Sequence, residues 1–105
     1  MQRIIKLFQN LPKTDEARII GKQLLRSATS TSANYRAVCR ARSDAEFHSK
    51  LSIVVEEADE TVFWIEILIE AEIVKKERLN ELLQEANEIL KIVASSRSTF
   101  TKNRK

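Results

Sequence analysis

The stretch Arg26–Phe47, RSATSTSANYRAVCRARSDAEF, decides the fold because it contains the boundary between two long predicted helices. Before that boundary, apolar and small residues recur every three or four positions and continue through the hydroxyl-rich segment. They are Ala17, Ile20, Leu24, Ala28, Thr31, Tyr35 and Val38. At about 100° per residue they lie within about 60° of one line, which predicts a single helix over roughly 14–41. Ser43 and Glu46 then form a capping box, which predicts that a new helix begins there.

The composition of the rest of the chain also favours helices. Among 105 residues there is one Gly and one Pro, so turn-forming residues are scarce. The predicted helices cover 1–10, 14–41, 43–71 and 76–98, and residues 98–105 are predicted to be a frayed tail. The expected fold class is all-α: an antiparallel up-and-down four-helix bundle with a short first helix, forming one domain over 1–105.

Charge is unevenly distributed along the sequence. Residues 1–42 contain nine Lys/Arg and two Asp/Glu. Residues 43–74 contain one Lys/Arg and nine Asp/Glu, and residues 75–105 contain eight Lys/Arg and four Asp/Glu. This segregation predicts a basic side and an acidic side on the folded molecule. The single cysteine, Cys39, excludes an internal disulfide, and no membrane span or signal peptide is visible. We therefore expect a cytoplasmic protein without a membrane partner.

Cations form a line along the predicted second helix, which suggests a nucleic-acid-binding surface. The line consists of Arg18, Lys22, Arg26, Arg36 and Arg40, with Ser27, Ser30 and Asn34 alongside. Arginine forks and small hydrogen-bonding side chains suit a phosphate backbone, and no base-reading pattern is evident. Two alternatives are a solvated basic face and pairing with the acidic residues Glu56, Glu57 and Glu60 of a neighbouring subunit.

The predicted third helix has a second apolar line on the side opposite its core stripe. Ile53, Trp64, Ile67 and Ala71 lie about 160–220° from Leu51 around the helix. An exposed apolar line containing tryptophan favours self-association. The predicted oligomer interface consists of Ile53, Glu56, Glu60, Trp64 and Ile67. The alternative is a helix buried on both sides within one chain.

The sequence offers little for catalysis. His48 is the only histidine, and Ala45 precedes it where a di-iron motif needs Glu. A Cys39–His48 nucleophile pair lacks an orienting third group, so Cys39 is interpreted as a small buried hydrophobic residue. There is no Gly-rich phosphate loop and no zinc spacing, so we expect a non-enzyme without cofactor or metal.

The segment from Lys22 to Val74 resembles the family of 23S rRNA intervening-sequence proteins. The family pattern Q-L-x-R-[SA]-x-x-S-x-x-A-N is matched here by Gln23, Leu24, Arg26, Ser27, Ser30, Ala33 and Asn34. The resemblance covers about residues 1–95 and implies an antiparallel bundle. Family members, and the similar accessory proteins of diversity-generating retroelements, form ring-shaped homopentamers with basic surfaces. The accessory proteins bind nucleic acid and a reverse transcriptase, so the resemblance implies a homopentamer with an RNA, DNA or protein partner.

Three departures from the family pattern stand out. Ser32 replaces a common proline, so we expect any break in the second helix to be softened. Glu72 replaces a usual glycine at the end of the third helix, which is expected to remove the left-handed cap. The first helix looks as though the chain begins midway through it, and the exposed core surface is expected to need a partner.

These observations support two hypotheses about function. The first is a non-catalytic, homo-oligomeric protein that binds the RNA or DNA backbone through the basic face of its second helix. The second is a protein-interaction scaffold that has no nucleic-acid ligand. The sequence alone does not show whether the arginines face solvent or a neighbour.

Overall fold

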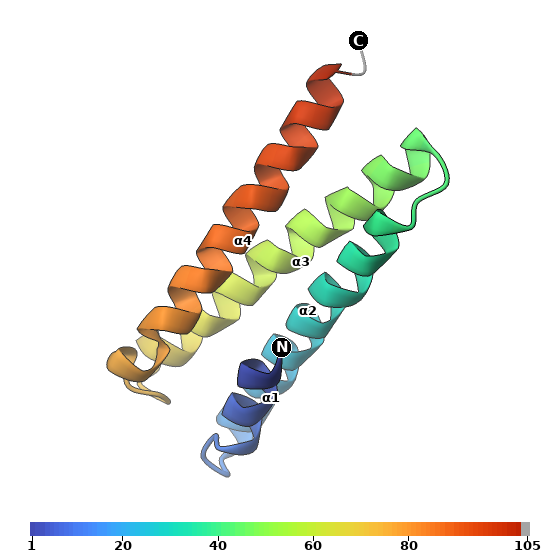
Figure 1. Cartoon of the computed structure of the whole chain (residues 1–105). Coiled ribbons are helices and arrows are strands. Elements are labelled where there is room, and N and C mark those ends of the chain that lie inside the picture. Colours follow the sequence, from blue (N-terminus) through green and yellow to red (C-terminus); the bar gives the residue numbers. More distant parts are fainter. Residues whose placement is uncertain (104–105) are drawn as a thin grey trace.

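The computed structural model describes residues 1–103 and consists of four α-helices in that range. They are α1 (Gln2–Gln9), α2 (Asp15–Cys39), α3 (Asp44–Glu70) and α4 (Lys76–Asn103), and the described residues contain no strand. Consecutive long helices run antiparallel to one another (Figure 1). The predicted all-α, up-and-down fold with a short first helix is confirmed. The frayed tail predicted for residues 98–105 is not found over 98–103, because α4 continues to Asn103. Residues 104 and 105 lie outside the described part of the chain.

Local side-chain contacts set the beginnings of α2 and α3. The Thr14 hydroxyl accepts a hydrogen bond from the Ala17 amide at 3.3 Å, and the Ser43 hydroxyl accepts one from the Glu46 amide at 3.1 Å. Each contact satisfies an amide that has no carbonyl partner within its helix. The predicted start of a helix at the capping box is therefore confirmed.

Helix α2 is unbroken through the hydroxyl-rich segment. The Thr29 hydroxyl donates to the Leu25 carbonyl at 2.8 Å, and the Thr31 hydroxyl donates to the Ser27 carbonyl at 2.7 Å. These side chains bond back to their own helix, so they do not compete with its backbone ladder. The prediction that one helix continues through this segment is confirmed.

Helix α3 ends in a left-handed residue that is not glycine. Glu72 has a φ of 58°, and its amide donates to the Ile69 carbonyl at 3.0 Å. The Ile73 amide donates to the Leu68 carbonyl at 3.0 Å. This pair of bonds is a Schellman motif, in which the residue after the C-cap is left-handed. The expectation that Glu72 removes this cap is wrong.

The core has two parts, and α3 contributes to both. One part lies where α1, α2, α3 and the beginning of α4 meet; it is built from Ile4, Leu11, Ala17, Leu24, Ala28, Ile65, Leu68 and Leu79. The other lies towards the end where α2 stops and α3 starts; it is built from Val38, Leu51, Val54, Val55, Ala58 and Val93. Helix α3 therefore lies between α2 and α4 and packs against both.

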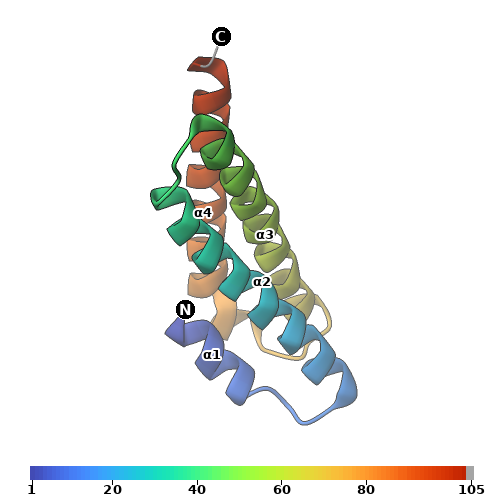
Figure 2. The same ribbon diagram turned by 90° about the vertical axis from the view of Figure 1, so that its right-hand side faces the viewer.

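The molecule is elongated, and α1 covers only part of its length. Its dimensions are 49 × 20 × 19 Å. Helix α1 packs on α2, and its N-terminal end lies partway along the long helices (Figures 1 and 2). Beyond that point no helix of the described chain lies over α2 and α4 on the α1 side. The short first helix thus leaves a length of the bundle with three helices.

Candidate nucleic-acid interface

Two cations of the predicted basic line are held by carboxylates of the same chain. Arg18 forms an ion pair with Asp15 on the adjacent helical turn. Arg26 reaches across to α3, where it forms an ion pair with Glu57 at 3.0 Å and a second with Glu60. The line is therefore not a continuous row of free cations, although it lies on an unbroken helix.

The pairing of Arg26 is part of a small network on the outer side of α2 and α3. The Trp64 indole nitrogen donates a hydrogen bond to Glu60 at 3.1 Å. Hydrogen bonds from Arg26 and then from Trp64 hold the pKa of the Glu60 carboxyl below its usual value, because they favour the charged form. One alternative from the sequence was that the arginines pair with carboxylates of a neighbouring subunit. In the structure Arg26 instead pairs with Glu57 and Glu60 of its own chain.

The small polar residues of the predicted site also have partners within the chain. Asn34 donates from its side-chain amide to the Ser30 carbonyl at 2.9 Å and to the Ser30 hydroxyl at 3.1 Å. Ser27 has 0% exposure and lies between α2 and α3, where its hydroxyl is 3.1 Å from that of Thr61. Ser27 thus allows close helix packing, and Ser30 and Asn34 retain only part of their hydrogen-bonding capacity for a ligand.

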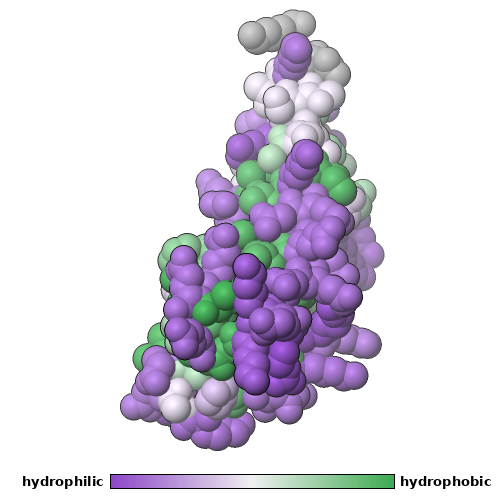
Figure 3. Space-filling view, turned by 90° about the vertical axis from the view of Figure 1, so that its left-hand side faces the viewer, coloured by the Kyte–Doolittle hydropathy of each residue, from purple (hydrophilic) through white to green (hydrophobic). Residues whose placement is uncertain are grey.

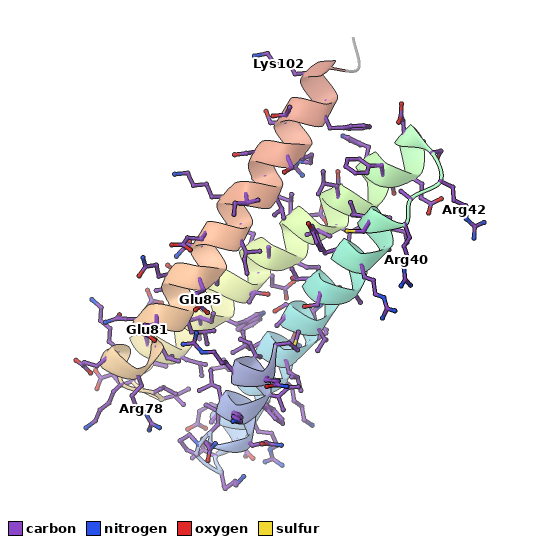
Figure 4. The ribbon with its side chains drawn as sticks, in the orientation of Figure 1. Arg40, Arg42, Arg78, Glu81, Glu85 and Lys102 are labelled. Carbon is purple, nitrogen blue, oxygen red and sulfur yellow. The ribbon has the colours of Figure 1, made fainter. Side chains whose placement is uncertain are left out.

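Three arginines gather where α2 ends and α3 begins, and we call them the α2–α3 corner: Arg36, Arg40 and Arg42. All three are exposed, and none forms an ion pair with any described residue. Figure 4 shows Arg40 and Arg42 pointing outward from this corner. Lys22 is also exposed and forms no ion pair with a described residue, but it lies further towards the start of α2. Sequence reasoning missed Arg42 because it follows the helix and has no place on a helical wheel.

The corner belongs to the more basic end of the molecule. Helix α4 ends near the start of α3, since His48 lies 3.1 Å from the Thr101 hydroxyl and the rings of Phe47 and Phe100 are 4.8 Å apart. Residues 33–52 and 90–103, which form this end, contain seven Lys/Arg and two Asp/Glu. The rest of the described chain contains nine Lys/Arg and thirteen Asp/Glu. Folding therefore gathers a surplus of cations at one end, while the rest of the described chain carries a net negative charge.

The predicted oligomer interface lies on the outer side of α3, away from α4. Ile53, Trp64 and Ile67 are each partly exposed, and Glu56 is exposed. Trp64 also packs against the core, so it is shared between the interior and the surface. Phe63, which sequence reasoning missed, is exposed beside Trp64 with their ring centroids 4.9 Å apart. Self-association through this outer face stays a prediction.

The residues considered for catalysis are not assembled into a reactive site. His48 contacts Thr101 and stacks on Phe100 at the far end of α4. Cys39 is exposed at the end of α2, so the prediction that it is buried is wrong; it lies at the last position of the helix, beyond the buried Val38. Over residues 1–103 no group of three or more His, Cys, Asp or Glu side chains gathers as a metal site would need. None of the helices in that range is long and apolar enough to cross a membrane.

The geometry defines a class of protein: a small all-helical bundle with an exposed cationic corner. The chain belongs to the family of 23S rRNA-intervening sequence proteins, whose family model matches residues 1–95. It is similar to a protein of unknown function from the S23 ribosomal protein family of Bacteroides thetaiotaomicron, known from a crystal structure. The two are 36% identical with a TM-score of 0.83, over 92% of this chain and 87% of the other. No curated protein matches the chain.

Proposed function

We propose that the protein is non-catalytic and binds the phosphate backbone of RNA or DNA through the α2–α3 corner. The observation that carries the proposal is the exposure of Arg36, Arg40 and Arg42 without a carboxylate partner among the described residues. The surrounding end of the molecule has a surplus of cations, which attracts a polyanion over several ångströms. The family name, which refers to an intervening sequence in 23S rRNA, is compatible with a nucleic-acid ligand.

The corner is suited to phosphates and not to base edges. A guanidinium group can hold two phosphate oxygens with parallel hydrogen bonds, and its binding releases counterions from the nucleic acid. The three arginines come from the last turn of α2 and the following loop, so no helix is presented lengthwise to a groove. We therefore expect binding with little sequence preference and a strong dependence on salt.

Self-association would increase the strength of this binding. If copies assemble through the outer face of α3, which includes Ile53, Trp64 and Ile67, each copy adds one α2–α3 corner to the particle. Several weak phosphate contacts on one particle act together because binding of the first raises the effective concentration of the others. A homo-oligomer is thus part of the proposal, as the resemblance to ring-forming family members also implies.

Binding is tested by titrating labelled structured RNA and single-stranded DNA with wild-type protein at several salt concentrations. The double variant Arg36→Glu, Arg40→Glu should bind at least about tenfold more weakly to every sequence tested. If each arginine neutralises one phosphate, the slope of log affinity against log salt should become shallower by about two.

The matched control is the double variant Arg18→Glu, Lys22→Glu, which makes the same change of net charge near the opposite end of α2. It should weaken binding much less, because Arg18 already pairs with Asp15 and both residues lie away from the corner. Equal losses in the two double variants would show that only net charge matters. Unchanged binding in the corner variant would remove the proposal.

A protein-interaction scaffold is the second candidate function, and an apolar groove beside α1 favours it. The groove exposes Tyr35, Ile89 and Ile92, which are unfavourable in water and suit a protein partner. A scaffold should assemble at physiological salt while nucleic acid fails to bind. Light scattering with and without RNA separates the two functions.

A further inference from the structure

We propose that the nucleic acid held at the α2–α3 corner is single-stranded, and that its unstacked bases pack in a hollow at the same end of the molecule. We call this the aromatic hollow, because Phe47 and Phe100 line it together with Ile92. It lies between the beginning of α3 and the last turns of α4. The inference rests on the proposed function, since it names the form of nucleic acid that the corner binds.

The aromatic hollow combines apolar side chains with polar ones. Ile92 is 64% exposed in it, beside the two phenylalanine rings. Lys91, Ser95 and Thr99 also line it from α4. Figure 3 shows the α4 side of the molecule, where hydrophobic and weakly polar surface lies between the charged side chains near the C-terminal end. A flat base with polar edges and an attached phosphate matches this combination.

Contacts between α3 and α4 hold the aromatic rings in position. The ring centroids of Phe47 and Phe100 are 4.8 Å apart, and the rings of His48 and Phe100 stack at 5.8 Å. His48 also lies 3.1 Å from the Thr101 hydroxyl. Because the rings are already ordered, a base that packs on them does not have to immobilise them. This preorganisation lowers the entropic cost of binding.

The polar side chains of the hollow can contact a nucleotide. Ser95 and Thr99 are exposed, and neither hydroxyl forms a hydrogen bond with a described residue. Lys91 is exposed and forms no ion pair within residues 1–103. A hydroxyl both donates and accepts, so it can pair with the edge of any base, and the lysine ammonium attracts a phosphate. The hollow therefore suits a nucleotide without selecting one base.

The corner and the aromatic hollow are close enough for one strand to reach both. Arg42 precedes Phe47 by five residues, so their Cα atoms are at most about 18 Å apart. About five nucleotides cover this distance at the spacing of a stacked strand, about 3.4 Å. The two carboxylates of this end, Asp44 and Glu46, lie in the first turn of α3, and neither lines the hollow. The surplus of cations favours a polyanion as the occupant over an apolar protein segment.

A duplex cannot use the hollow in the same way. Its bases are stacked on one another, and flipping one out costs free energy. A single strand already presents base faces, which stack on aromatic side chains with little dependence on sequence. The hollow therefore adds affinity for single strands, whereas the arginines of the corner bind the phosphates of either form.

Assembly through the outer face of α3 would leave the hollow open. Ile53, Trp64 and Ile67 lie about 200–260° from Phe47 around α3, at about 100° per residue. The outer face and the hollow are thus on opposite sides of this helix. A particle of several copies would present several corners and hollows to one strand, which strengthens binding.

The first test compares a fluorescently labelled single DNA strand with a strand of equal length and charge in which every base is replaced by an abasic site. Wild-type protein should bind the abasic strand at least about fivefold more weakly, because base stacking is lost while the phosphates remain. An RNA strand of the same sequence, measured in parallel, shows which of the two sugars is preferred. Equal affinity for the normal and the abasic strand would overturn the inference.

The second test changes the hollow. Phe100→Leu removes a ring but keeps an apolar side chain, and it should lower affinity for the normal strand at least about fivefold. Its affinity for the abasic strand and for a duplex should equal that of the wild type, because the two losses report the same contact. Ile92→Ser, at an exposed position, should act in the same way without disturbing the ring contacts. The matched control is Ile19→Ser: Ile19 is 62% exposed, lies outside the hollow and should keep wild-type affinity.

Failure of this inference can be told apart from failure of the proposed function. Phe100→Leu should keep the wild-type dependence on salt, whereas Arg36→Glu with Arg40→Glu makes that dependence shallower. If only the arginine variant weakens binding, the corner binds phosphates and the hollow binds no base. If Ile92→Ser changes the particle mass in light scattering and leaves strand affinity unchanged, the hollow is a protein contact and the inference is wrong. Wild-type protein that binds no nucleic acid would overturn both.

Discussion

Replacing Gly21 with alanine tests how closely the segment after α1 must approach α2. A Cβ atom at Gly21 would lie 2.5 Å from Leu11 Cδ1 and 3.0 Å from Phe8 Cδ1. Leu11 is only 5% exposed, so its side chain has little room to move away. Alanine gains about 1 kcal/mol in helix propensity, whereas overpacking costs about 1–3 kcal/mol. The steric effect should win, and Gly21→Ala should lower the free energy of unfolding by about 1 kcal/mol, or Tm by about 5 °C.

A double-mutant cycle with Leu11→Ala separates the two effects. Leu11→Ala alone should cost about 2–5 kcal/mol because it leaves a cavity in the core. In that background the closest atom is gone, and Gly21→Ala should become stabilising by about 0.5–1 kcal/mol through helix propensity. Urea unfolding followed by far-ultraviolet circular dichroism measures all four free energies. If Gly21→Ala stabilises the wild-type protein, or changes stability equally in both backgrounds, the reasoning is refuted.

Three further predictions concern helix ends and the outer network, each measured by urea unfolding. Ser43→Ala should cost about 1 kcal/mol because it removes the cap of α3, and no loss would mean that the capping bond is not populated in solution. Glu72→Gly should stabilise by about 0.5–1 kcal/mol, since glycine adopts a positive φ without strain; a destabilised variant would contradict this. Glu60→Gln should lower the free energy of unfolding by about 0.5 kcal/mol at pH 7, a small value because the ion pair with Arg26 is partly exposed to solvent. Glu66→Gln, at an exposed position, is the control and should leave the free energy of unfolding unchanged. Because the pKa of Glu60 is lowered in the folded state, this contribution is fully present at pH values above the ordinary pKa of a glutamate and should vanish as the pH falls through the lowered pKa.

The helices that the sequence predicted well are those specified by local interactions. The capping box at Ser43 and Glu46 involves residues three apart, and the apolar period of α2 continues through its hydroxyl-rich segment. The end of α4 was missed because it depends on a distant contact. The segment after residue 97 is rich in Ser and Thr, yet Phe100 packs against Phe47 and His48 of α3. Such tertiary packing stabilises helical turns that have low intrinsic propensity.

The candidate site was predicted only in part, for the same reason. The line from Arg18 to Arg40 lies on one helix as expected, but its pairing was not visible in the sequence. Arg26 meets Glu57 and Glu60, which are 31 and 34 residues away along the chain. Arg42 follows the helix, so helical periodicity carries no information about its position. The three-dimensional structure therefore moves the candidate site from the middle of α2 to the α2–α3 corner.

Taken alone, the sequence determined the number and type of elements, most of their starts and the faces that they bury. These properties depend on residues three or four positions apart, whose relative placement a helix imposes on its own. Only the tertiary structure decided which cations are neutralised and where the bundle lacks its fourth helix. Those outcomes depend on which helices lie side by side and how far each extends, and such distances arise from packing between segments that are remote in the chain.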